Sequence, residues 1–197
     1  MDGINVLNLN PKSELKLSIQ QRNLVLGCLL GNSSIVLPPG NRGHYFYIRQ
    51  SKKEDINILA YKATFLKSFA RPTAIVEDKN SIKWYSITHN EWKSIYEECY
   101  KDNRKFLTME WLNKLSRTSF AMMFLDLGIM VENRLALNIN SFKKQNNLLL
   151  QYFNEIDLTC EIKKNKLLFT KEATNYFLKI ISPEVPEYLL YRIYEFF

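Results

Sequence analysis

The sequence predicts an α+β protein made of two related halves. Two short apolar segments, residues 24–34 and 121–130, each have the character of a buried helix that ends near a glycine. The same order of elements follows each of them: a strand, a helix, a pair of strands and a further helix. The chain has 197 residues, 46% of them hydrophobic, which is enough for one folded domain. The repeated order therefore indicates an internal duplication.

The first half is expected to begin with a capped helix. Ser18 is a favourable N-cap for a helix that runs to about Gly31. Gly27 and Gly31 lie four residues apart on one helical face, so a second helix can approach the backbone closely there. The following pattern predicts a loop at 38–40, a strand at 42–50, a helix at 53–69, strands at 74–77 and 82–87, and a helix at 91–100.

The second half is predicted to repeat this order. A charged connector at 101–104 and a short helix at 109–115 precede the second apolar segment. The elements expected after it are a strand at 134–140, a helix at 141–153, strands at 158–163 and 166–170, and a helix at 171–181. We expect an N-terminal arm over residues 1–16 and a single domain over 17–197, divided into pseudo-repeats of about 17–105 and 106–197.

The charge balance favours a polyanionic partner. Lys and Arg number 27 against 20 Asp and Glu, which gives a net charge of +7 and a pI near 9.2. A phosphate surface rewards distributed cations, so nucleic acid is favoured over a membrane. No apolar run approaches the roughly 18 residues of a membrane span, and no targeting segment is evident.

The cysteines and histidines are scattered. The three cysteines include no CxxC pair, and the two histidines are isolated, which argues against a disulfide framework and a zinc site. The abundance of Asn, Lys, Ile and Leu is typical of an AT-rich coding genome such as that of an organelle. We therefore expect an organellar protein, with the mitochondrion favoured and the organelle itself as the site of synthesis.

One face of the strand at 42–50 is expected to carry aromatic rings and cations. Apolar and polar residues alternate along it, which places Phe46 and Ile48 on the opposite face. Rings beside cations suit stacking on unpaired bases and pairing with phosphates. The expected contacts on this surface are Tyr45, Tyr47 and Arg49, with Arg42 at the start of the strand and Lys83 and Tyr85 on the neighbouring strand.

The chain resembles the LAGLIDADG homing endonuclease family in its single-chain form with two motifs. LVLGCLLGNSS at 24–34 is similar to the first motif, which typically reads like LVGSLLGDGS, and AMMFLDLGIM at 121–130 is similar to the second, AYWFMDDGS. Further landmarks match in order and spacing: YFYIRQS, KWYSIT, IYEECYKDNRK, LNINSF and LLYRI. The resemblance covers about residues 18–193.

The resemblance implies a pseudo-twofold αββαββα pair. The two motif helices would pack along the axis, and two antiparallel sheets would form a saddle over nucleic acid. Members of the family cut long DNA sites, and some assist the splicing of intron RNA as maturases. Cleavage in the family depends on one carboxylate at the foot of each motif helix, where the pair holds divalent metal.

The aligned motifs place Asn32 and Leu127 at these two acid positions. An amide is a poor ligand for a hard cation, and leucine offers no ligand atom. Asp126 lies one residue too early, about 100° away around the helix. We therefore expect no catalytic residue, no metal and no cofactor.

The polar residues that surround the metals in the family are only partly matched. Gln50 and Asn140 correspond to the positions at the ends of the first strands, although strict alternation would put Gln50 on the Phe46 face. Lys171 corresponds to the basic pocket position, and Thr88 replaces its partner. We expect Gln50, Asn140 and Lys171 to contact nucleic acid.

The resulting hypothesis is a catalytically inactive RNA-binding protein of a mitochondrial ribosome. Its partners would be ribosomal RNA and neighbouring ribosomal proteins, with no membrane and no homodimer required, and the extended arm favours such an assembly. A group I intron maturase is the first alternative. An active site-specific DNA endonuclease that uses Asp126 is the second, and a protein–protein scaffold is the third.

Overall fold

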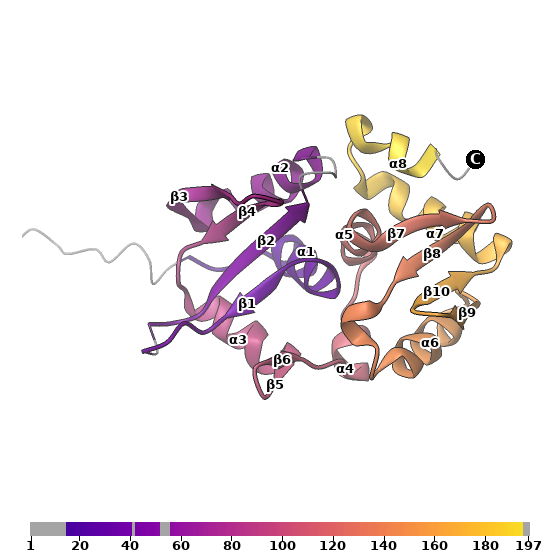
Figure 1. Cartoon of the computed structure of the whole chain (residues 1–197), viewed down its shortest axis with the longest axis horizontal. Helices are drawn as coiled ribbons and strands as arrows, with labels where there is room; N and C mark the ends of the chain where they lie inside the picture. The colour runs from indigo at the N-terminus through magenta and orange to yellow at the C-terminus, as the bar shows by residue number, and fades with distance from the viewer. Residues whose placement is uncertain (1–14, 41, 52–55, 195–197) are drawn as a thin grey trace, which may run out of the picture.

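A computed structural model of the chain describes residues 15–40, 42–51 and 56–194, so most of the expected arm lies outside the described residues. Each half runs helix, two strands, helix, two strands, helix, and the two sheets lie side by side (Figure 1). The predicted duplication and the α+β class are therefore confirmed. No described helix is long and apolar enough to cross a membrane.

The first half contains one four-stranded antiparallel sheet, with the strand order β1-β2-β4-β3. The second half repeats the arrangement in a sheet with the order β7-β8-β10-β9. The elements of the first half are α1 (Ile19–Leu30), β1 (Ser34–Val36), β2 (Tyr45–Ser51), α2 (Ile56–Phe65), η1 (Lys67–Phe69), β3 (Ala70–Glu77), β4 (Ser81–Ser86) and α3 (Asn90–Cys99).

A short hairpin and a helix connect the halves: β5 (Tyr100–Lys101), β6 (Arg104–Lys105) and α4 (Met109–Leu112). The second half then contains α5 (Arg117–Leu127), β7 (Gly128–Val131), β8 (Arg134–Asn138), η2 (Asn140–Phe142), α6 (Asn146–Glu155), β9 (Cys160–Lys163), β10 (Lys166–Phe169) and α7 (Lys171–Ile181). The described chain ends with η3 (Ser182–Glu184), η4 (Glu187–Leu189) and α8 (Tyr191–Tyr194).

The structure differs from the predicted elements mainly at short strands and boundaries. The sequence pattern did not locate β1 and β7, although the αββαββα pair implied by the resemblance includes a strand after each motif helix. The connector at 101–104 is part of the β5–β6 hairpin. The helix expected at 141–153 begins only at Asn146, because η2 occupies the preceding residues. Two- to four-residue strands are too short for alternation to identify them; their pairing with a longer neighbour determines them instead.

The core is centred on α1 and α5, which pack against each other between the two sheets (Figure 1). Every residue from Leu24 to Leu30 is buried, so this C-terminal part of α1 is apolar on all sides rather than along one stripe. Ser18 caps the helix as predicted: its hydroxyl accepts from the Gln21 backbone N–H at 3.1 Å. The Gln21 side chain accepts from the Ser18 backbone N–H and completes a capping box.

The predicted close approach occurs at both glycines of the first motif. A β-carbon on Gly27 would lie 2.6 Å from the Ser119 α-carbon. A β-carbon on Gly31 would lie 2.5 Å from the Asp126 β-carbon. Glycine is required at the first contact because the opposing atoms belong to the backbone of α5 and cannot rotate away.

The change Gly27→Ala is expected to destabilise the fold by about 2 to 3 kcal/mol, because the added methyl forces α1 and α5 apart. Urea unfolding measures the loss. Gln20→Ala, at an exposed position of the same helix, is the matched control and should stay within about 0.5 kcal/mol of the parent. Equal stability of the two variants would contradict the close packing of the helices.

Candidate nucleic-acid interface

The predicted aromatic surface lies on the first sheet. Antiparallel pairing places Tyr47 opposite Tyr85 and Arg49 opposite Lys83, so side chains from β2 and β4 share one face. The Tyr85 ring lies 5.8 Å from that of Tyr47 and 6.0 Å from that of Tyr45, measured between centroids. Phe46 and Ile48 are fully buried on the other face, as alternation predicts.

Arg71 on β3 adds a cation that the sequence analysis did not identify. Its guanidinium carbon lies 4.2 Å from the centroid of the Tyr85 ring, in a cation–π contact. Lys83 forms an ion pair with Asp78 at 2.5 Å. No sequence signal points to Arg71, because its pairing with Tyr85 depends on the irregular register of β3 after Ala70.

The other predicted contact residues lie elsewhere. Gln50 is 2% exposed, and its side chain lies on the buried face of β2, as strict alternation requires. Arg42 precedes β2 and is exposed. Asn140 is exposed at the first residue of η2, and Lys171 is exposed at the first residue of α7. The structure therefore joins the five predicted residues of β2 and β4 into one surface, buries Gln50, and places Asn140 and Lys171 in the second half.

The feet of the motif helices are residues 30–32 at the end of α1 and residues 127–129 at the end of α5. Asn32 is exposed, and its backbone N–H donates to the Asp126 carboxylate at 3.1 Å. Leu127 is half-buried and packs against the hydrophobic core. Neither position provides an anionic oxygen.

Asp126, the displaced acid, is held in a buried ion pair. Its carboxylate accepts from the Lys62 ammonium through Oδ1 and from the Asn32 backbone through Oδ2. Both side chains of the pair are 0% exposed. A metal ion could use Asp126 only if this pair were broken, which would leave Lys62 charged in the core without its carboxylate.

A cation caps each motif helix at its foot. The Lys105 ammonium on β6 donates to the Gly31 carbonyl, and the Arg192 guanidinium on α8 donates to the Gly128 carbonyl, each at 3.1 Å. Gly31 and Gly128 are the C-cap residues of α1 and α5. Positive charge is favourable at a helix C-terminus, where unpaired carbonyls carry partial negative charge.

Lys105 and Arg192 were not predicted as site residues. The internal repeat could have identified them, because each lies in the segment that follows the last helix of its half. Burial lowers the pKa of Lys105 to about 8, although the Asp126 carboxylate acts in the opposite direction. The carbonyl contact does not offset the loss of hydration that the charged ammonium suffers.

The described residues do not fit a divalent metal at the feet. The two foot positions expected to be acidic hold an amide and an apolar side chain, and the Asp126 carboxylate beside them is ion-paired with Lys62. Within the described parts of the chain, no three His, Cys, Asp or Glu side chains cluster as metal ligands. The site instead concentrates cations, a composition suited to contact with phosphate oxygens.

Comparison with known proteins identifies relatives of this fold. Residues 22–186 match the profile of the LAGLIDADG DNA endonuclease family. The homing endonuclease I-WcaI bound to its DNA recognition sequence superposes with a TM-score of 0.80 at 17% identity, covering 95% of each chain. I-DmoI in complex with DNA and Ca superposes with a TM-score of 0.53 at 14% identity, covering 84% of this chain and 91% of that one.

I-DmoI in complex with DNA and Mn gives a TM-score of 0.54 at 12% identity, covering 83% of this chain and 96% of that one. A search of curated proteins returns no significant match. At these identities the superpositions establish a common fold only.

The pKa of Lys105 makes stability depend on pH. Between about pH 8 and pH 10.5 the unfolded chain holds the Lys105 proton more firmly than the folded protein, so this site adds stability as the pH rises. The unfolding free energy of the parent minus that of Lys105→Met should therefore increase by roughly 2 kcal/mol between pH 7.5 and pH 10.

Denaturant titrations at the two pH values measure this difference. Lys93→Met removes an exposed lysine of α3 and serves as the control, with no comparable change relative to the parent. Parallel pH profiles for the parent and Lys105→Met would contradict the buried environment assigned to the ammonium.

Proposed function

The chain belongs to the LAGLIDADG DNA endonuclease family, and we propose that it binds nucleic acid, RNA rather than DNA, without cutting it. Its role would be structural, in the RNA of a mitochondrial ribosome. The solved relatives I-WcaI and I-DmoI are described in complex with DNA, which supports binding of nucleic acid by the shared fold.

The observation that carries the loss of cleavage is the chemistry at the feet. Phosphodiester hydrolysis assisted by metal needs anionic oxygens to hold the cation beside the scissile phosphate. Asn32 and Leu127 provide none. The two carboxylate oxygens of Asp126 accept hydrogen bonds from the Lys62 ammonium and the Asn32 backbone N–H. Lys105 and Arg192 add positive charge at the same place, which opposes a divalent ion and favours a phosphate.

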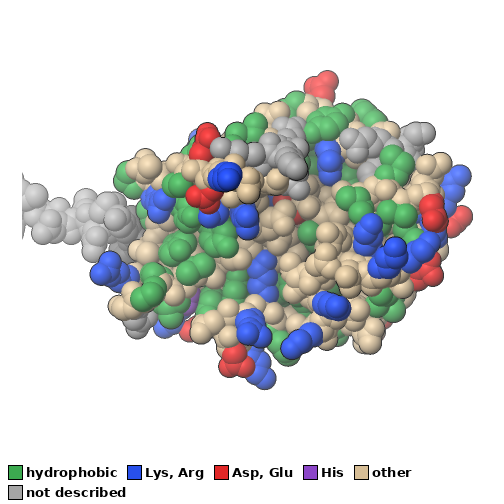
Figure 2. Space-filling model, in the orientation of Figure 1, with side chains coloured by type: hydrophobic (Ala, Val, Ile, Leu, Met, Phe, Trp, Pro, Cys, Tyr) green, Lys and Arg blue, Asp and Glu red, His purple; other side chains and the backbone are tan. Residues whose placement is uncertain are grey.

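The aromatic surface of the first sheet supports RNA as the partner. Tyr45, Tyr47 and Tyr85 are partly exposed on the strand face that also carries Arg49 and Lys83. Green side chains gather over this sheet in Figure 2. Rings of this kind stack on unpaired bases, which folded RNA offers in loops and bulges and duplex DNA does not.

The proposed assignment to a mitochondrial ribosome rests on composition. The net charge of +7 suits a protein embedded in phosphates, and the Asn- and Lys-rich sequence suits an organellar genome. An intron maturase would share both properties. The identity of the bound RNA distinguishes the two functions, because ribosomal RNA and a single intron differ in sequence.

Replacing the foot residues tests the loss of cleavage. The double variant Asn32→Asp/Leu127→Asp should gain a binding site for Mn²⁺ or Ca²⁺ that isothermal titration calorimetry detects, because it supplies two carboxylates at the feet. The parent should give no heat from this site. Asn32→Ala/Leu127→Ala is the matched control and should behave as the parent does.

A cleavage assay with Mg²⁺ on randomised target DNA provides the opposing outcome. Cleavage by the parent protein would refute the proposed inactivity. If that cleavage were lost in Asp126→Asn while circular dichroism showed the fold of the parent, the displaced acid would be identified as the metal ligand.

A further inference from the structure

A wide groove opens between the two halves, next to the foot of α1. It has a volume of about 1020 Å³ and lies between the β5–β6 hairpin and the η2–α6 connection. Ser34 at the start of β1 and Asn140 at the start of η2 both line it, so the groove adjoins both sheets. No residue of β2 or β4, the two strands that carry the aromatic surface, lines the groove.

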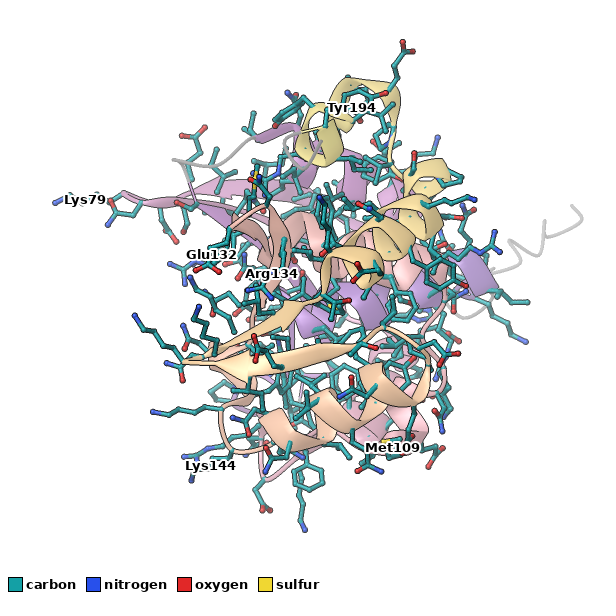
Figure 3. The ribbon with its side chains drawn as sticks, turned by 90° about the vertical axis from the view of Figure 1, so that its right-hand side faces the viewer. Lys79, Met109, Glu132, Arg134, Lys144 and Tyr194 are labelled. Atoms are coloured by element: carbon teal, nitrogen blue, oxygen red, sulfur yellow. The ribbon has the colours of Figure 1, made fainter. Side chains whose placement is uncertain are left out.

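The groove is strongly basic. Five cationic side chains line it against one carboxylate, that of Asp102: Lys101, Arg104, Lys105, Lys143 and Lys144. Figure 2 shows blue side chains gathered along the lower edge, where the halves meet. The labelled Lys144 projects outward in Figure 3, on the side that faces the viewer in Figure 1.

Three of these cations lack the carboxylate partners found elsewhere. Arg104, Lys143 and Lys144 are exposed, and none forms an ion pair with another described residue. By contrast, Lys83 on the first sheet pairs with Asp78, and Arg134 on the second pairs with Glu132. The groove therefore holds charge that the protein itself does not neutralise.

The hairpin wall of the groove combines rigid backbone with an exposed ring. Asp102 and Asn103 have φ values of 51° and 59°, the conformation of a tight two-residue hairpin turn. Phe106, directly after β6, is 40% exposed, and the Lys101 ammonium lies 5.4 Å from its centroid. A cationic channel with an aromatic ring on its wall is the arrangement that binds single strands.

We propose that this groove binds the sugar–phosphate backbone of a single-stranded RNA segment, as a second contact surface beside the aromatic face of the first sheet. The proposal rests on the proposed RNA-binding function and adds the path of the strand. Phosphates would pair with Arg104, Lys143 and Lys144, and one base would stack on Phe106.

The test compares two triple variants that remove the same charge. Arg104→Gln/Lys143→Gln/Lys144→Gln removes three of the five cations that line the groove, and Lys16→Gln/Lys93→Gln/Lys179→Gln removes three exposed lysines outside it. A 20-nucleotide oligouridine RNA and a duplex RNA of equal length are the probes, and Kd is measured from 50 to 300 mM salt.

The groove variant should bind oligouridine about tenfold or more weakly than the parent at 100 mM salt. The slope of log Kd against log salt should fall by about 2, since each lost phosphate contact on a single strand accounts for about 0.7. The control variant should keep the slope of the parent. In a second measurement, Phe106→Ala should weaken binding of oligouridine and not of the duplex.

Three outcomes would overturn the proposal in distinguishable ways. Equal slopes for the groove and control variants, with tight RNA binding by both, would refute the groove and leave the proposed function intact. If the groove variant lost affinity for duplex RNA and for oligouridine equally, the groove would be assigned to duplex RNA instead. A parent protein that binds neither probe would refute the groove and the proposed RNA binding together.

Discussion

The contact between α1 and α5 at Gly27 is the constraint on which the rest of the structure depends. Because α5 backbone occupies the space that a side chain would need, the two helices approach closely enough to share one apolar core. This approach sets both helix feet at the junction of the halves and fixes the two sheets on either side of it. The helix caps, the aromatic surface and the basic groove all take their positions from this one packing contact.

Electrostatics at the junction follow from the same geometry. The close approach at Gly31 brings the Asp126 carboxylate under the end of α1, where the buried Lys62 of the first half neutralises it. An ion pair of this kind contributes little net stability, but removal of either partner would strand a charge in the core. This carboxylate thus joins the two halves, while Lys105 and Arg192 place positive charge at the feet.

The sequence predicted what depends on local pattern and missed what depends on pairing across the junction. Ser18, the glycines of α1 and the alternation of β2 follow from spacing, and each was confirmed. β1 and β7 consist of three and four residues, and only their longer partners define them. Lys62 shares the buried face of α2 with Ile58 and Leu59, and only the approach of α5 reveals its partner. Arg71 reaches its contact through an irregular strand register that no spacing rule predicts, whereas Lys105 and Arg192 lie in corresponding segments of the two halves, where the internal repeat could have identified them.

The central claim is that this endonuclease fold has become a metal-independent RNA-binding protein. Ultraviolet crosslinking in intact organelles, purification under denaturing conditions and sequencing of the attached nucleic acid test it most directly. The account predicts ribosomal RNA fragments crosslinked through the aromatic surface, in an amount that does not change when EDTA is present during irradiation of an organelle lysate. Recovery of DNA alone, or of no nucleic acid, would contradict it.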